Sequence, residues 1–155
     1  MGTRPGTIDP GVLLYLEQQN GMDATALQDL LYNKSGLKGV SGISGDMRTL
    51  LASEAAGAKD AIALFVFRLV REIGALTASL GGLDGLVFTA GIGEHSAEIR
   101  AMTAQKLAFL GAKLNAAANQ ANATRISQED SGILMLVIPT NEEEMIARHM
   151  LALVA

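Results

Sequence analysis

Two glycines separate an apolar segment of this sequence from the helix predicted to follow it. The segment FTAGIGE, residues 88–94, lets a backbone approach a ligand closely and offer free N–H groups to an anion. A tight strand-to-helix turn with Ser96 as the helix cap explains the same residues, and this interpretation stays open. Ser96 stands where a dinucleotide fingerprint requires a third glycine, and no GxxxxGK[ST] loop exists, so neither of these nucleotide motifs is present.

An acidic helix start, NEEE at residues 141–144, follows a second apolar segment. In the structural interpretation Asn141 caps the helix, Glu144 completes a capping box, and the acidic residues complement the helix dipole. In the functional interpretation one carboxylate lies at the C-terminal edge of a parallel strand, where open α/β sheets bind ligands. There it partners Mg²⁺ directly or through water.

Two further segments carry charged residues in glycine-rich surroundings. Arg4 lies in the loop GTRPG and is either solvated or able to clamp a phosphate with its guanidinium fork. Asp46-Met47-Arg48 is locally typical of a helix cap followed by a surface cation. Neither segment settles a function by itself.

Alternating helices and short buried strands must position these residues. Apolar segments predict buried strands at 83–90 and 133–138. Helices are predicted from Pro10 up to Gly21, and over 23–33, 46–53, 59–80, 96–110 and 142–153. Residues 39–45 are expected to form a loop, and 115–131 a turn-rich region.

The order strand, helix, strand, helix in the second half predicts an α/β fold with a small, mostly parallel sheet. Two buried strands cannot form a covered sheet alone. Either further strands exist, with 112–114 as one candidate, or the chain is part of something larger.

The helix predicted over 59–80 is amphipathic. Its expected apolar face is Leu64, Phe67, Val70, Ile73 and Leu76. Its expected polar face is Arg68, Arg71 and Glu72, and these charges argue against a membrane span.

Composition narrows the function classes. The chain has 155 residues, enough for one domain, and a net charge of −4 from 12 basic and 16 acidic side chains. Because the basic residues never form a run, we expect no nucleic-acid binding. With no cysteine, disulfides and thiolate chemistry are excluded. The N-terminus has no signal-peptide pattern, so a cytoplasmic enzyme without a membrane contact is expected.

Four segments in this order resemble the acetate kinase family, the acyl-phosphate-forming branch of the actin and hexokinase superfamily. They are MGTRPGTIDPGVLLYL, LYNKSGLKGVSGISGDMRTLL, LGGLDGLVFTAGIGEHSAEIR and VIPTNEEEMIAR. The resemblance implies that the α/β fold is the helix-rich part of an actin/RNase H-like domain. It also implies that 1–155 is the C-terminal nucleotide-binding portion, with the N-terminal half absent.

The resemblance also implies a role for each matching residue. Arg4 stabilises the transferring phosphoryl group, and Glu142 is associated with Mg²⁺. The adenosine is contacted by two sets, Asp46, Met47 and Arg48, and Gly91, Ile92, Gly93, Glu94 and His95. His95 stands where the family has asparagine, so a polar contact there differs.

The implied reaction transfers the γ-phosphoryl group of ATP to acetate, giving ADP and acetyl phosphate. The cofactors implied are ATP/ADP and Mg²⁺, and the partners are an adenine nucleotide, a small carboxylic acid bound through the missing half, and a second copy in a homodimer. We expect the isolated chain to be inactive. Two alternatives stay open: an adenine-nucleotide-binding and dimerisation module, and a segment of a propionate or butyrate kinase.

Overall fold

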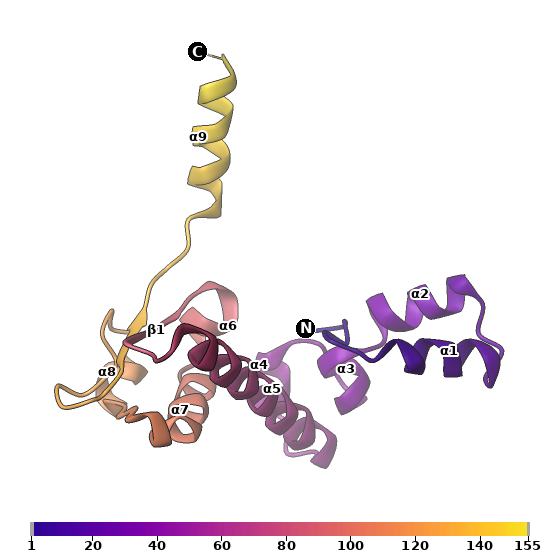
Figure 1. Ribbon diagram of the computed structural model, residues 1–155, viewed down its shortest axis with the longest axis horizontal. Coiled ribbons are helices and arrows are strands. Elements are labelled where there is room, and N and C mark those ends of the chain that lie inside the picture. The colour runs from indigo at the N-terminus through magenta and orange to yellow at the C-terminus, as the bar shows by residue number, and fades with distance from the viewer. Residues whose placement is uncertain (1, 155) are drawn as a thin grey trace. The chain divides into compact units, whose positions relative to one another are not determined.

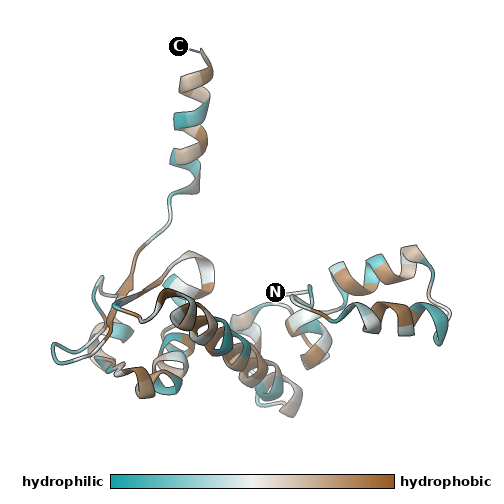
Figure 2. Cartoon of the chain, in the orientation of Figure 1, coloured by the Kyte–Doolittle hydropathy of each residue, from teal (hydrophilic) through white to brown (hydrophobic). Residues whose placement is uncertain are grey.

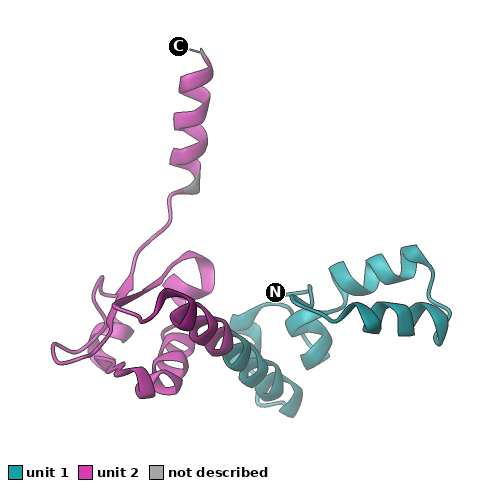
Figure 3. Cartoon of the chain, in the orientation of Figure 1, with its two compact units in different colours: residues 1–68 teal, residues 69–155 magenta. Residues whose placement is uncertain are grey.

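The computed structural model describes residues 2–154, except for the side chains of Glu142 and Val154. The chain divides into two compact units, residues 1–68 and 69–155 (Figure 3). Helix α5, Ala56–Leu80, is labelled in Figure 1 and contributes to both units, as the change of colour along it in Figure 3 shows. Each unit is described separately below.

Unit 1 is helical. Its other helices are α1 Pro10–Gln18, α2 Ala24–Asn33, α3 Gly36–Ser41 and α4 Met47–Leu51. Asp9 caps α1 by accepting a 2.7 Å hydrogen bond from the Gly11 N–H, as predicted. The buried apolar residues of unit 1 are Leu37, Met47, Leu50, Ala58, Ala61, Ile62 and Val66.

Unit 2 contains a two-stranded parallel sheet. Strand β1 is Gly85–Phe88 and strand β2 is Leu134–Val137, with Gly85 opposite Leu134 and Phe88 opposite Val137. The remaining elements are α6 Ala90–His95, α7 Ala97–Lys106, the 3₁₀ helix η1 Ala108–Leu110, α8 Ala116–Gln120 and α9 Glu142–Val154. The core is formed by Phe88, Ala104, Leu107, Ala112, Ile126, Ile133, Met135 and Val137. Both predicted strands and their parallel pairing are therefore confirmed. The expected burial was wrong for one face of the sheet, where Val87 and Leu134 are 50% and 41% exposed.

The predicted loops contain more helix than expected. Helix α3 occupies 39–41, where we expected a loop. It is held because the Ser35 and Lys38 N–H groups donate to the carbonyls of Thr3 and Gly2, and Gly42, at a left-handed φ of 67°, ends it. Helix α6 forms within the glycine turn, and α8 forms in the region 115–131, which we expected to be rich in turns. The candidate strand 112–114 contributes one antiparallel bridge, from Leu114 to Ser127.

The expected apolar face of α5 was partly wrong. Val70 and Ile73 pack against the core of unit 2, but Leu64, Phe67 and Leu76 are 44%, 60% and 62% exposed. A three-residue step drifts around a helix of 3.6 residues per turn, and the buried residues of α5 are instead Ala58, Ala61, Ile62 and Val66. The apolar residues along α5 are seen in Figure 2. Within residues 2–154, no helix is long and apolar enough to span a membrane.

Buried and exposed side chains alternate along β2, and this alternation predicts how two substitutions change the stability. Met135 is fully buried and Leu134 is 41% exposed, on the opposite face of the strand. Met135→Ala should lower the free energy of unfolding by about 2–5 kcal/mol, because it leaves a cavity in the core. Leu134→Ala is the matched control and should cost less than half as much. Urea unfolding followed by circular dichroism measures both, and equal losses would contradict the register.

Candidate functional site

The parallel pairing brings two segments together that are distant in the sequence. Because β1 and β2 run in the same direction, the segments that follow them leave the sheet at the same edge. The Ile138 N–H donates a 3.0 Å hydrogen bond to the Phe88 carbonyl and continues the pairing past β2. The glycine turn after β1 therefore lies beside the segment that leads to the acidic helix start.

Glu94 ties these two segments directly. Its Oε1 accepts hydrogen bonds from the Thr140 N–H, at 2.9 Å, and from the Thr140 hydroxyl, at 3.1 Å. The Thr140 N–H is the main reason why the pKa of Glu94 lies below its ordinary value of 4.5, and the hydroxyl adds to the effect. The carboxylate is thus an acceptor that joins the turn to the end of the neighbouring strand.

The two glycines of the turn have different roles in the fold. A Cβ on Gly93 would lie 3.2 Å from the Phe88 carbonyl carbon, so Gly93 allows α6 to pack closely on the end of β1. A Cβ on Gly91 would meet no atom within 4 Å. The described fold therefore does not need a glycine at position 91, and the space beside Gly91 is open.

Ala90, which begins the turn, has a left-handed backbone conformation with a φ of 57°. For an L-residue with a Cβ this conformation costs about 1–2 kcal/mol. Such strain often occurs at functional sites, where the surrounding structure maintains it. In this turn the exposed positions are Ala90, Gly91 and His95, whereas Ile92, Gly93 and Glu94 are half-buried.

The sequence analysis missed two residues that form hydrogen bonds with the glycine turn, Arg100 and Thr140. Arg100 is fully buried, and its guanidinium donates to the carbonyls of Gly93 and Glu94, each at 2.8 Å. Arg100 could have been found from its spacing, because it lies in one buried helical stripe with Ala97, Ala104 and Leu107.

In unit 1, two predicted segments meet through their glycines. A Cβ on Gly2 would lie 2.8 Å from the Gly45 carbonyl oxygen, and a Cβ on Gly45 would lie 2.8 Å from the Gly2 carbonyl oxygen. This contact brings Arg4 and Asp46 to the same hollow of about 520 Å³, which they line with both glycines and Thr3. The Arg4 guanidinium lies over the Tyr32 ring, 4.9 Å from its centroid.

The segment after Gly45 confirms its local interpretation. Asp46 caps α4 through the Arg48 N–H, at 2.9 Å, and forms an ion pair with the exposed Arg48 side chain, at 2.6 Å. The hydrogen bonds from that side chain are the main reason why the pKa of Asp46 falls from 3.8 to about 2. Met47 is 4% exposed and belongs to the core of unit 1.

The acidic helix start is capped as predicted. Asn141 Oδ1 accepts from the Glu144 N–H, and Asn141 Nδ2 donates to Glu144 Oε2, both at 3.0 Å. Glu144 therefore bonds to the Asn141 side chain and not to its backbone. The side chain of Glu142 lies outside the described part of the chain. Elsewhere in that part, no three His, Asp or Glu side chains converge on a metal position.

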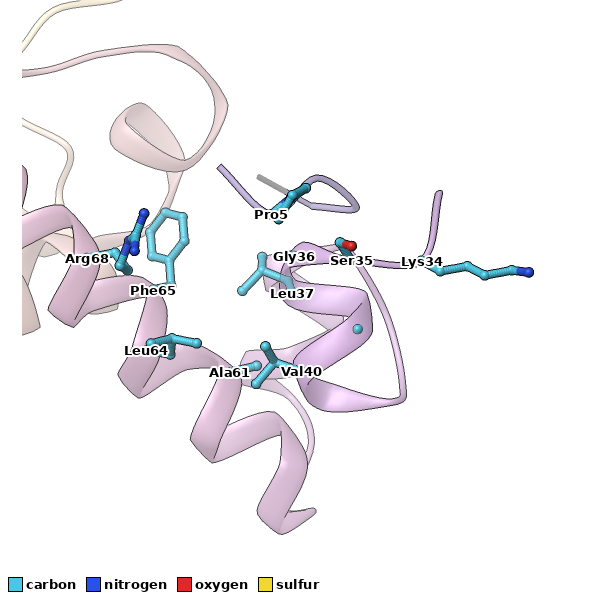
Figure 4. A pocket seen from close by; sticks show the side chains of 11 residues that line it. Pro5, Lys34, Ser35, Gly36, Leu37, Val40, Ala61, Leu64, Phe65 and Arg68 are labelled. Carbon is cyan, nitrogen blue, oxygen red and sulfur yellow. The ribbon is translucent and has the colours of Figure 1, made fainter. Parts of the chain in front are cut away.

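A separate apolar pocket of about 360 Å³ lies in unit 1, between α3 and α5 (Figure 4). Leu37 and Val40 of α3 line it together with Ala61, Leu64 and Phe65 of α5. None of the residues that the sequence singled out for a site lines this pocket.

The sequence model described as the Acetokinase family matches residues 1–148. This chain belongs to that family. An acetate kinase of Rhodopseudomonas palustris (strain TIE-1) is 56% identical over 151 residues, which are 96% of this chain and 38% of the relative. The chain thus spans about two-fifths of the length of the curated relatives that it matches.

Solved structures of kinases share this fold. An acetate kinase of Porphyromonas gingivalis superimposes with a TM-score of 0.90 and 34% identity over all of this chain and 40% of that chain. A propionate kinase of Francisella tularensis subsp. tularensis SCHU S4 gives a TM-score of 0.88 and 38% identity over 96% of this chain and 39% of that chain. The predicted fold class, the helix-rich part of an actin-like domain with a small parallel sheet, is confirmed.

A substitution can test the close contact between Gly2 and Gly45 in unit 1. Gly45→Ala should lower the free energy of unfolding by about 1–3 kcal/mol, because its Cβ overlaps the Gly2 carbonyl and displaces the Arg4 loop. Gly74→Ala is the matched control: its Cβ meets no atom within 4 Å, and it should stabilise α5 by about 0.5–1 kcal/mol. Urea unfolding and the NMR resonances of the Tyr32 ring report the change. Unaltered stability and ring resonances in Gly45→Ala would refute the close contact.

The tie between Glu94 and Thr140 should depend on pH. Because the folded pKa of Glu94 is lowered, its carboxylate stabilises the fold above pH 4.5, and the contribution is lost as pH falls through the folded pKa. NMR titration of the Glu94 carboxyl should give a midpoint below 4.5. Thr140→Val keeps the N–H donor, so the midpoint should rise but stay below 4.5. A wild-type midpoint at or above 4.5 would show that the tie does not form.

Proposed function

We propose that this chain is the nucleotide-holding part of a kinase that transfers the γ-phosphoryl group of ATP to acetate, giving ADP and acetyl phosphate. The observation that carries the proposal is the tie from Glu94 to Thr140 at the C-terminal edge of the parallel strands. Ligands bind at this edge in open α/β sheets. The tie joins two segments that are matched by the family model.

In unit 2 the glycine turn contacts the adenosine and ribose through residues 91–95. The open space beside Gly91 supports this role, since a planar group can approach the backbone there without displacing protein atoms. His95 is exposed and offers its imidazole where the family has an amide. It contributes a different polar contact.

In unit 1 Arg4 supplies positive charge to the transferring phosphoryl group. Phosphoryl transfer needs in-line positioning and neutralisation of charge on the equatorial oxygens rather than covalent help from the protein. An exposed guanidinium, held at its loop by the close Gly2 and Gly45 backbones, suits that task. Asp46, the Met47 backbone and Arg48 flank the adenosine in this proposal.

Glu142 is the proposed protein partner of Mg²⁺. In kinase sites Mg²⁺ keeps several waters and binds one or two carboxylates together with substrate phosphates, so a single glutamate is a sufficient donor set. The ion supplies neutralising charge at the phosphates. Asn141 fixes the start of α9 and therefore the position of the neighbouring Glu142 backbone.

The remaining three-fifths of the relatives' length would supply the acceptor site. Large apolar side chains exposed on α5 and α9 support a missing partner surface, which the rest of a kinase or a second copy in a homodimer would cover. They are Leu64, Phe67, Leu76, Ile146, Met150 and Leu151. The propionate kinase neighbour favours propionate as the second candidate acceptor. The proposed reaction uses ATP, which suits a cytoplasmic location.

Calorimetry with ADP and Mg²⁺ tests the proposal. The wild-type chain and the control Gly74→Ala should bind, and Gly91→Ala should weaken binding by about tenfold, since its Cβ enters the ligand space. The stability of Gly91→Ala should stay near that of the wild type. No heat from the wild type at millimolar ADP would refute nucleotide binding.

In the same samples, hydroxylamine trapping with ATP and acetate should detect no acetyl phosphate. The isolated chain lacks the part to which we assign the acceptor site. Acetyl phosphate formed by this chain alone would contradict that assignment.

A further inference from the structure

We infer that Arg100 is a positioning residue that fixes the glycine turn in the conformation that receives the nucleotide. This inference rests on the proposed function, because it gives the turn a ligand to receive. Arg100 lies on α7, has no exposed surface, and donates hydrogen bonds to residues of α6 and of the segment around α8.

The guanidinium of Arg100 makes five hydrogen bonds, and all five acceptors are neutral oxygens. Nη1 donates to the carbonyls of Gly93 and Glu94, each at 2.8 Å. Nε donates to Asn119 Oδ1 at 2.7 Å, and Nη2 donates to the Asn119 carbonyl at 2.8 Å and to Asn122 Oδ1 at 2.6 Å. The N–H donors of the planar guanidinium are thus bonded to the glycine turn on one side and to residues 119–122 on the other.

The turn needs an external partner because α6 is short. A helix of six residues is unstable alone, and its last carbonyls accept no hydrogen bond from an N–H group within the helix. A cation at the C-terminal end of a helix meets the negative end of its dipole. Arg100 supplies both the donors and the charge to Gly93 and Glu94.

The residues on the other side of the guanidinium are themselves held by hydrogen bonds and burial. Asn119 is 2% exposed, and its Nδ2 donates a 2.8 Å hydrogen bond to the Ala97 carbonyl at the start of α7. Asn122 has a left-handed φ of 49°, which asparagine tolerates better than most residues. Arg100 therefore links the glycine turn to residues 119–122, which are bonded to the start of α7.

A role in packing alone does not explain the choice of arginine. Burial lowers the pKa of the Arg100 guanidinium, so the buried charge has a desolvation cost, and no carboxylate forms an ion pair with it among the described residues. Apolar residues of similar volume are often as stable or more stable in such positions. The five directed donors are what an apolar residue would lose.

The test compares Arg100→Met and Arg100→Lys with Thr103→Val. Thr103 is the matched control because it is also fully buried on α7 and its hydroxyl bonds only the Ile99 carbonyl. We expect both Arg100 variants to speed amide exchange at residues 94–96 by about tenfold or more relative to β1 and β2, and to weaken ADP binding by a similar factor. Lysine should not restore either property, because one ammonium group cannot donate to both the glycine turn and residues 119–122.

Asn122→Ala provides a milder variant if the Arg100 variants fail to fold. It removes one acceptor on the side away from the turn and should shift both readouts in the same direction by a smaller factor. Thr103→Val should lower the free energy of unfolding without a selective change at residues 94–96 or in ADP affinity.

Two results separate this inference from the proposed function. If the wild type binds ADP but the Arg100 variants show the exchange pattern and affinity of Thr103→Val, Arg100 is a packing residue and the inference is wrong. If the wild type binds no ADP, the proposed function fails, and with it the role of Arg100 in nucleotide binding. Selective exchange at 94–96 would then still report that Arg100 holds the turn.

Discussion

Parallel pairing of β1 and β2 is the constraint on which the candidate site depends. Four paired positions, from Gly85 and Leu134 to Phe88 and Val137, send both following segments to one edge of the sheet. An antiparallel pair would send them to opposite edges. A slip of one residue would turn Met135 and Val137 out of the core, so burial of these side chains also fixes the register of the site.

The loops at this edge then need partners for their backbone groups, and two charged side chains supply them. The Glu94 carboxylate accepts from the Thr140 N–H, and the Arg100 guanidinium donates to the carbonyls of Gly93 and Glu94. Charged groups form stronger hydrogen bonds with backbone dipoles than neutral ones do. Helix α6 is therefore held by two interactions: the Glu94 carboxylate bonds it to Thr140 at the sheet edge, and the buried Arg100 guanidinium bonds its last carbonyls.

The sequence predicts the elements better than their contacts. Both strands follow from short apolar segments, and the Asp9 and Ser96 caps follow from local hydrogen-bonding chemistry. Local rules failed where tertiary contacts decide. Glycine-rich 90–95 forms α6, in which Gly93 lies close to Phe88. Arg100 is buried, although a charged residue within a polar helix is usually solvated. The roles of the site residues depend on a ligand, which neither periodicity nor packing specifies.

Each unit organises its own share of the candidate residues. Close glycine backbones in unit 1 align the Arg4 loop with Asp46, and hydrogen bonds in unit 2 align the glycine turn with Thr140. A ligand that meets loops already ordered loses less conformational entropy on binding. The chain spans about two-fifths of its relatives' length. The nucleotide binding that we propose needs only these loops, whereas transfer also needs an acceptor held in line with the phosphoryl group. This difference separates the binding that we propose for the chain from the catalysis that we assign to a longer polypeptide.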